Sequence, residues 1–339
     1  MKLSIITINY NNAEGLRKTL ASVAAQTYPN IEHIIIDGGS TDGSVEVIKE
    51  YVRNVERMNK LTNEGIHVVW LSEPDKGIYN AMNKGIEVAL GRRIVNSFNR
   101  SERSEDKNHG IEIALGRRVV NTNHTSNITH NTSQESLCDY VQILNSGDLL
   151  AAPDVTERMM AALDSLNAQR STLNENGSPA ILYGNMLKKD FTTGKIIGKS
   201  REVEYSLRQY YSSTMNHDCC YFRRNLFDTY GLYDENLKIV SDWKWFLQAI
   251  GLGHVKPVYV DIDVTIFDVS GISETNLALR NQERRQVLKE LLPPAILADY
   301  DAHAFEIEQM NRLRRRHLYG LVYFIERVLF KLEKWGILR

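Results

Sequence analysis

The chain begins with three successive units in which a short apolar run precedes a polar turn and an amphipathic helical pattern. The apolar runs are residues 3–8, 31–36 and 67–71, and apolar residues at helical spacing follow each turn. Strands that alternate with helices favour a parallel sheet covered by helices on both faces. Ligands of such sheets bind beside the carboxyl ends of the strands. The sequence therefore predicts an α/β fold with its binding site in the polar turns that follow the strands.

The repeated pattern is interrupted between about residues 92 and 137. Residues 85–96 return almost unchanged as residues 110–121, and a stretch rich in Ser, Thr, Asn and His follows. One duplication cannot form a repeat architecture, which needs about three units to bury a shared core. We therefore expect an insertion with an internal duplication, exposed as a surface loop.

Strand and helix patterns resume after this insertion. Short strands are predicted at residues 140–144 and 181–183, and residues 255–267 resemble paired edge strands. The last part of the chain changes to charged helices. We expect an α/β domain over residues 1–275 and a C-terminal helical extension over residues 276–339.

The composition excludes several classes of protein. The 339 residues include 41 Lys or Arg and 42 Asp or Glu, for a formal net charge of -1, and 42% are hydrophobic. Such a chain can bury a core without disulfides, which excludes disorder as its main state. Its balanced charge creates no overall field for nucleic acid, so we expect no nucleic-acid partner. The three cysteines include the neighbours Cys219 and Cys220, which are poorly placed to pair, and this favours a cytoplasmic location.

The turn at residues 37–43 follows the second apolar run and precedes a helical pattern. Its glycines leave backbone amides free, and a carboxylate there can accept hydrogen bonds from a base or a ribose hydroxyl. The same turn has a purely structural explanation, in which Asp42 caps the following helix. Composition alone does not decide between nucleotide binding and capping.

A second polar turn, Asn145-Ser146-Gly147-Asp148, follows the strand predicted at residues 140–144. A hard cation bound to a diphosphate needs few protein ligands, because phosphate oxygens and waters supply the others. Asp148 alone would suffice. The structural alternative is a solvent-facing turn before a helix.

Asp242 lies in an apolar segment beside Trp243 and Trp245. Desolvation there would raise its pKa and suit it to act as a general base, although it could also cap a helix. His217 precedes a strand-like run, where a histidine is more often structural than catalytic. No Cys or His spacing fits a zinc site, and the sequence contains neither a Walker-type phosphate loop nor a nucleophile elbow.

Four segments in a fixed order carry a resemblance to a known family. They are residues 4–11 (SIITINYN), 34–44 (IIIDGGSTDGS), 73–85 (EPDKGIYNAMNKG) and 143–148 (ILNSGD). Two later segments, residues 231–235 (GLYDE) and 241–243 (SDW), match the acceptor-side and catalytic-base region of the same family. Together they resemble the family 2 glycosyltransferases, in particular the branch that builds bacterial polysaccharides such as capsule or exopolysaccharide.

The resemblance implies a GT-A fold, a Rossmann-like and mostly parallel sheet with helices on both faces. The implied nucleotide-sugar-binding residues are Thr7, Asn9, Asp37, Asp75, Lys76 and Asn145, with Asp37 facing the base. Asp148 would hold the divalent metal, Mn²⁺ or Mg²⁺, on the donor diphosphate. The sequence departs from the family's usual Asp-x-Asp motif, since Asn145 and Gly147 stand at positions that are often acidic.

The resemblance also implies a mechanism and two substrates. Asp242 would accept the proton of an acceptor hydroxyl that attacks opposite the departing diphosphate, so the anomeric configuration would invert. His217 and Asp234 would lie on the acceptor side. The donor would be a nucleoside-diphosphate sugar, and the acceptor a glycan or a lipid-linked molecule.

The C-terminal segment at residues 312–339 contains eight Lys or Arg and two Glu, a net charge of +6. Its apolar residues recur at helical spacing, and its basic residues lie opposite them. A basic amphipathic helix can lie in the interface of an anionic membrane, or it can pair with a second copy in a dimer. We therefore expect peripheral membrane contact at the inner face of the cytoplasmic membrane, or dimerisation, through this segment.

Two other functions compete with glycosyl transfer. A nucleotidyltransferase uses a similar sheet and metal, but it usually starts with a Gly-rich, basic phosphate loop, which is missing after the first strand. The chain could also be a catalytically inactive module that binds a nucleotide-sugar or glycan. Metal-dependent hydrolysis of a donor would separate an enzyme from an inactive module.

Overall fold

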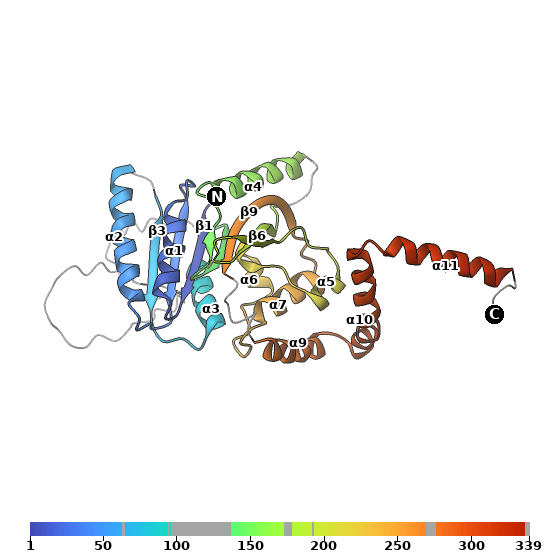
Figure 1. Ribbon diagram of the computed structural model, residues 1–339. Helices are drawn as coiled ribbons and strands as arrows, with labels where there is room; N and C mark the ends of the chain where they lie inside the picture. Colours follow the sequence, from blue (N-terminus) through green and yellow to red (C-terminus); the bar gives the residue numbers. More distant parts are fainter. Residues whose placement is uncertain are drawn as a thin grey trace, which may run out of the picture. The chain divides into compact units, whose positions relative to one another are not determined.

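Figure 1 shows a computed structural model of the protein. It describes residues 1–62, 65–93, 95, 137–172, 178–191, 193–268 and 276–335. The chain divides into two compact units, residues 1–283 and 284–339. Almost all of the expected insertion at about residues 92–137, including the second copy of its duplicated segment, lies outside the described residues.

In the described part of the first unit, nine strands form one sheet. They are β1 (Leu3–Asn9), β2 (Ile31–Asp37), β3 (His67–Ser72), β4 (Tyr140–Asn145), β5 (Leu149–Leu150), β6 (Ile181–Lys189), β7 (Ile196–Lys199), β8 (Cys220–Arg223) and β9 (Val258–Asp268). Their order is β3-β2-β1-β4-β8-β6-β9-β5, with β7 paired to β6. The apolar run predicted as paired edge strands is one long strand, β9, which lies between β6 and β5.

The strands β3, β2, β1 and β4 are parallel, and β8 runs against them. Asn9 at the end of β1 is level with Asp37 of β2, which is level with Ser72 of β3. The carboxyl ends of these strands therefore share one edge of the sheet. The predicted α/β class is confirmed, and the polar turns after the strands meet where ligands of such sheets bind.

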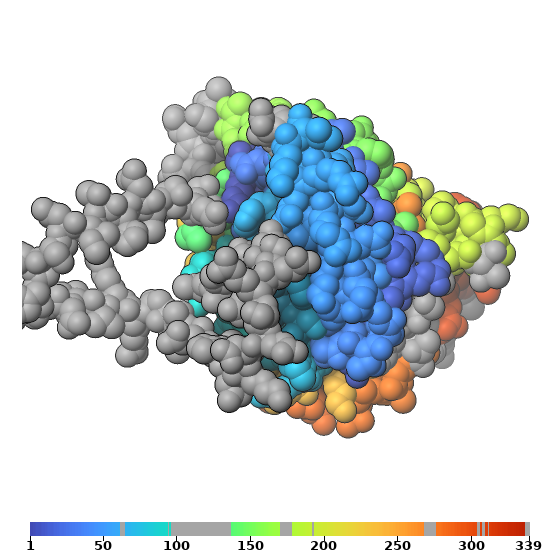
Figure 2. All heavy atoms as spheres, turned by 90° about the vertical axis from the view of Figure 1, so that its left-hand side faces the viewer, coloured from blue at the N-terminus to red at the C-terminus, as the bar shows by residue number. Residues whose placement is uncertain are grey.

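Helices cover both faces of the parallel strands. The helices of the first unit are α1 (Ala13–Ala24), α2 (Ser44–Thr62), α3 (Ile78–Ala89), α4 (Val155–Thr172), α5 (Leu207–Ser212), α6 (Leu226–Thr229) and α7 (Ser241–Phe246). Leu16 of α1 and Ile48 of α2 are buried in one core cluster with Ile5 of β1. A Cβ at Gly85 of α3 would lie 2.3 Å from Ile6 Cγ2, so α3 packs tightly on the opposite face. Figure 2 views the side of the molecule that α2 covers.

Three further helices follow: α9 (Leu277–Leu291), α10 (Pro294–Arg315) and α11 (Tyr319–Lys334). Helix α9 begins in the first unit and ends in the second. Pro294 opens α10 at a position where the missing N–H of proline costs no helical hydrogen bond. Within the described residues, no helix combines the length and apolarity needed to cross a membrane.

Candidate active site

A cavity of about 970 Å³ opens in the first unit at the shared edge of the sheet. Its lining includes residues from the ends of β1 and β4, from the loops after β2 and β3, and from the start of α3 and α7. Among the lining residues are Asn9, Tyr10, Gly38, Asp75, Tyr79, Asn145, Asp148, His217, Lys238 and Asp242. Six predicted site residues are thus brought together: Asn9, Asp75, Asn145, Asp148, His217 and Asp242.

Asp37 is fully buried and does not line this cavity. Its carboxylate accepts hydrogen bonds from the Asn9 amide at 2.8 Å, from the Ser72 hydroxyl at 2.7 Å, and from both the amide and the hydroxyl of Ser40. Burial alone would raise the pKa of Asp37, but these hydrogen bonds lower it overall. In this structure Asp37 shapes the loop that brings Gly38 to the cavity, and its contact with a base stays a prediction.

Thr7 is also buried away from the cavity lining. Its hydroxyl lies 2.9 Å from Nε2 of His33, and Nδ1 of His33 lies 2.8 Å from the hydroxyl of Tyr51 in α2. Burial lowers the pKa of His33 to about 3, so this ring stays neutral. Thr7 faces the core between the sheet and α2, not the site that the resemblance implied.

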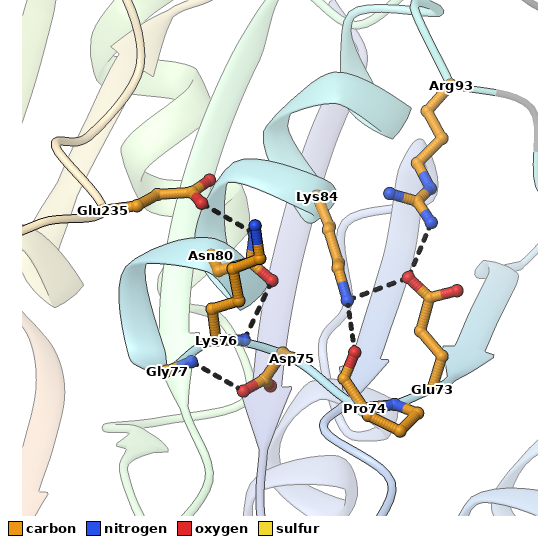
Figure 3. A network of polar contacts seen from close by, with 9 residues as sticks. All are labelled: Glu73, Pro74, Asp75, Lys76, Gly77, Asn80, Lys84, Arg93 and Glu235. Carbon is orange, nitrogen blue, oxygen red and sulfur yellow. Dashed lines mark hydrogen bonds and ion pairs between the residues drawn. The ribbon is translucent and has the colours of Figure 1, made fainter.

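Asp75 reaches the cavity from the loop after β3 (Figure 3). Its Oδ1 accepts a 2.9 Å hydrogen bond from the amide of Gly77. A Cβ at Gly38 would lie 2.5 Å from Oδ2 of Asp75, so a larger residue there would displace the Asp75 carboxylate. Lys76 is exposed outside the cavity lining, and its amide donates to Asn80.

Ion pairs hold the start of the same loop. Glu73 pairs with Lys84 of α3 at 2.8 Å and with Arg93 at 2.7 Å. Lys84 also donates to the carbonyl of Pro74 at 3.1 Å (Figure 3). Burial would raise the pKa of Glu73, but the two cations lower it overall. These contacts fix the main chain directly before Asp75.

Asp148 and Asn145 form the part of the cavity that could hold a cation. The side chain of Asp148 is almost buried, and Gly147 before it has a φ of 110°, which favours glycine. The buried Oδ1 of Asn145 has no hydrogen-bond partner among the described residues. A carboxylate and an amide oxygen are hard donors that suit Mg²⁺ or Mn²⁺. The described residues contain no group of three His, Cys, Asp or Glu side chains placed to hold a metal. The residues present therefore fit a cation that a diphosphate also binds.

Asp242 is held from two sides at the first turn of α7. The hydroxyl of Tyr79 donates to Oδ1 at 2.9 Å, and Nδ1 of His217 lies 3.4 Å from Oδ2. Burial would raise the pKa of Asp242, but the contacts with His217 and Tyr79 lower it overall. The raised pKa expected from the apolar sequence context is therefore wrong, because the sequence does not reveal these two partners.

His217 lies between Asp242 and the candidate cation site. Its Nε2 is 3.4 Å from the amide nitrogen of Asn145. Burial would lower the pKa of His217, but the carboxylates of Asp242, Asp218 and Asp148 raise it overall. The raised pKa favours the protonated form of His217 more than an ordinary histidine would.

Asp234 does not line the cavity. Its carboxylate forms a 2.9 Å ion pair with Lys244. The next residue, Glu235, accepts a hydrogen bond from Asn80 at 2.9 Å (Figure 3). It also accepts one from Asn83 at 3.0 Å. The predicted acceptor-side segment is thus clamped against α3 through its glutamate.

Sequence reasoning missed Tyr79, Tyr10 and Lys238 as cavity residues. Tyr10 directly follows β1 and is 65% exposed, a place where an aromatic side chain signals ligand stacking. The position of Tyr10 after the strand could have revealed it. No local pattern links Tyr79 to Asp242, which lies 163 residues later.

Residues 4–97 match the sequence model of the family described as Glycosyl transferase family 2. The chain is similar to the uncharacterized glycosyltransferase Rv1514c of Mycobacterium tuberculosis, with 26% identity over 276 residues that cover 80% of this chain and 76% of the relative. The "Putative teichuronic acid biosynthesis glycosyltransferase TuaG" of Bacillus subtilis is 38% identical over 93 residues, which cover 27% of this chain and 33% of the relative.

Solved structures share the fold. S. aureus TarS 1-349 in complex with UDP superposes with a TM-score of 0.53 and 17% identity, covering 92% of this chain and 74% of that chain. The mannosyltransferase PcManGT from Pyrobaculum calidifontis, in complex with GDP-Man and Mn²⁺, gives a TM-score of 0.50 and 14% identity over 85% of this chain and 63% of that chain. The predicted GT-A fold is confirmed.

Proposed function

We propose that this chain is a family 2 glycosyltransferase that transfers a sugar from a nucleoside-diphosphate sugar to a hydroxyl of an acceptor, with inversion of configuration. The acceptor is a glycan or lipid-linked molecule of cell-surface polysaccharide synthesis, a class that the name of the relative TuaG supports. UDP and GDP-Man in the structures of similar fold support the donor class. These relationships favour a glycosyltransferase over a nucleotidyltransferase or an inactive module.

The single observation that carries this proposal is that Asp75, Asp148 and Asp242 line one cavity. A nucleotide-sugar needs a site for its nucleoside, a cation for its diphosphate and a base for the acceptor hydroxyl. The three carboxylates come from different loops at the shared edge of the sheet, so each can serve one of these needs.

The nucleoside would occupy the end of the cavity formed after β1, β2 and β3. The exposed ring of Tyr10 offers a surface for stacking a base. Asp75 and Asn9 are among the polar residues that line this end, and Oδ1 of Asn9 has no hydrogen-bond partner among the described residues. Lys76 lies on the same loop as Asp75 and would act from outside as a general positive charge.

The diphosphate would lie near Asp148 and Asn145, which would hold Mg²⁺ or Mn²⁺ through their oxygens. The bound ion would neutralise negative charge on the leaving diphosphate. Mn²⁺ in the structure of PcManGT supports the use of a divalent metal.

Asp242 would accept the proton from the acceptor hydroxyl. Because its pKa is lowered, the carboxylate is ionised at neutral pH and can take a proton without first losing one. Tyr79 and His217 fix the orientation of the carboxylate, which is the geometric requirement for general base catalysis. Attack from the side opposite the diphosphate would invert the anomeric configuration.

A panel of nucleotide-sugars tests the proposal, with and without Mg²⁺ or Mn²⁺, scored by released nucleoside diphosphate. We expect metal-dependent release from one donor. Asp242→Asn should lower transfer about 100-fold or more while nucleotide affinity stays nearly constant, because the carboxylate acts on the acceptor. Asp148→Ala should abolish the metal-dependent release of nucleoside diphosphate. Asp164→Asn, at an exposed position of α4, is the matched control.

The anomeric configuration of the product tests the proposed inversion. NMR of the product should show the anomeric configuration opposite to that of the donor. Retention would contradict the role of Asp242 as a base. Release of nucleoside diphosphate that is unaffected by Asp242→Asn, in the presence of acceptor, would remove Asp242 from the mechanism.

Helix α11 would contact an anionic membrane surface that holds a lipid-linked acceptor. No side chain of α11 is buried. Its apolar side chains cover one wide arc, and they include Leu321, Ile325, Val328, Leu329 and Leu332. Arg327, Lys331 and Lys334 lie on the opposite side, so the helix offers both apolar area and positive charge.

Sedimentation of the full chain with vesicles tests this contact. Binding to vesicles of phosphatidylglycerol and phosphatidylcholine should exceed binding to phosphatidylcholine alone, and Leu329→Glu should abolish it. Leu61→Glu is the matched control, since Leu61 is 82% exposed on α2. A concentration-dependent dimer that Leu329→Glu disrupts, without vesicle binding, would assign α11 to dimerisation instead.

A further inference from the structure

More acidic than basic side chains line the cavity. Asp75, Asp148 and Asp242 line it, and Lys238 is the one lysine or arginine among its lining residues. His217 is already engaged with the Asp242 carboxylate. A diphosphate brings further negative charge into this space, and unpaired anions are costly to bring together away from water. Among the described residues that line this cavity, Lys238 is therefore the lysine or arginine that can meet an anionic ligand.

The main chain at Lys238 is held in place by a buried carboxylate. Glu283 accepts a hydrogen bond from the amide of Lys238 at 2.8 Å and from the amide of Ile239 at 3.0 Å. The side chain of Glu283 is only slightly exposed, so both bonds are shielded from water. The point from which the Lys238 side chain extends is thus fixed relative to the cavity wall.

The ammonium group of Lys238 is available to a ligand. Within the described part of the chain, it forms no ion pair or hydrogen bond, and its residue is exposed. In contrast, Lys84 and Lys244 are both committed to carboxylates. A lysine that lines a cavity rich in carboxylates, yet pairs with none of them, can bind an anion without first breaking an internal contact.

We propose that the ammonium group of Lys238 binds the diphosphate of the nucleotide donor. This assignment rests on the proposed function. Lys238 lies between the two segments, residues 231–235 and 241–243, that resemble the family 2 glycosyltransferases. Lysine suits the task, since its compact charge on a flexible stem can follow the phosphates as the sugar departs. The same chemistry would serve a phosphate of a lipid-linked acceptor, and the experiment separates the two sources.

Calorimetric titration in EDTA measures the contribution of Lys238 without any divalent cation. For each base, the nucleoside, its monophosphate and its diphosphate are titrated into the wild type, Lys238→Met and Lys238→Arg. Lys238→Met should weaken diphosphate binding about tenfold, the effect of one charge-assisted contact, and leave nucleoside binding unchanged within about twofold. Lys238→Arg should keep most of the affinity. Lys49→Met, at an exposed position of α2 outside the cavity, is the matched control.

The outcomes separate this assignment from the proposed function. If the wild type binds neither nucleosides nor diphosphates, the proposed function fails and takes the assignment with it. If the wild type prefers diphosphate over nucleoside and Lys238→Met keeps that preference, only the assignment of Lys238 to the donor diphosphate fails. A second measurement needs no variant: diphosphate affinity of the wild type should fall with added salt, whereas nucleoside affinity should not.

Discussion

The hydroxyl of Tyr79 donates a 2.9 Å hydrogen bond to Oδ1 of Asp242, so the start of α3 fixes the carboxylate at the start of α7. Burial and the adjacent carboxylate raise the pKa of Tyr79 well above its usual value, so the phenol keeps its proton and remains a donor. The orientation of the proposed base is therefore set by a residue that follows the donor-binding loop.

Replacing Tyr79 by Phe tests this orientation. The change retains the ring and removes the donor, so kcat for transfer should fall about tenfold or more while donor affinity stays within about twofold. The pKa of Asp242 should rise, which would move the acidic limb of the kcat profile to higher pH. Tyr233→Phe is the control, because the buried Tyr233 hydroxyl has no hydrogen-bond partner among the described residues. Equal kcat values for the two variants would contradict the role of Tyr79.

Gly38 should tolerate no side chain. In Gly38→Ala, the new Cβ would lie 2.5 Å from Oδ2 of Asp75 and 3.1 Å from the ring of Tyr10, so both side chains that we propose to bind the nucleoside must shift. We expect donor affinity to fall about tenfold or more, by loss of a contact comparable to a charge-assisted hydrogen bond. Calorimetry with the nucleoside diphosphate measures this. Gly198→Ala, which would meet only ordinary contacts of 3.6 Å or longer, should bind as the wild type does.

His33 should make the fold sensitive to acid. Its folded pKa is about 3 because it is buried, whereas an unfolded histidine has its ordinary value of 6.5. Below that value the unfolded chain gains a proton that the folded chain cannot accept, so stability falls as pH falls. Between pH 7 and 4.5 the contribution of His33 to the free energy of unfolding should decrease by about 2.5 kcal/mol.

Urea unfolding of the wild type and His33→Gln at several pH values measures that decrease. The variant should be less stable at pH 7, since it loses packing against Tyr51, and the difference should shrink as pH falls. Parallel curves for the two proteins over this range would show that His33 does not titrate between the folded and unfolded states.

The thiols should be unreactive in the folded protein. Cys138, Cys219 and Cys220 are each at most 1% exposed, and burial raises the pKa of Cys138 to about 11. The thiolate is the reactive form, so a disulfide reagent at pH 8 should label none of them quickly. Guanidinium should expose all three. Fast labelling of any thiol in the folded chain would contradict the burial of that residue.

The sequence predicted those features that local patterns determine. Alternating strands and helices gave the parallel part of the sheet. The end of β1 and the turns after β3 and β4 contribute Asn9, Asp75 and Asp148 to the lining of the cavity. The interpretation of residues 255–267 was wrong, because alternating apolar residues do not distinguish one long strand from two paired ones.

Long-range contacts account for what the sequence did not reveal. A carboxylate after a strand can face a ligand or bind its own loop, and the choice at Asp37 depends on Asn9 and Ser72, which come from neighbouring strands. The lowered pKa of Asp242 likewise depends on Tyr79 and His217, which are distant in the chain. Local residue type therefore identified the candidate groups but not the roles that their partners give them.

Helix α3 touches both halves of the cavity wall. Its Lys84 holds Glu73 and Pro74 before Asp75, while Asn80 and Asn83 hold Glu235 of the segment that leads to Asp242. A helix of this length is stiff, so it sets the separation of the regions that we propose for the donor and the acceptor. A chimaera that exchanges residues 231–246 for those of a glycosyltransferase must therefore keep a carboxylate that these two asparagines can bind. Without it, the exchanged segment would lie at the wrong distance from the donor.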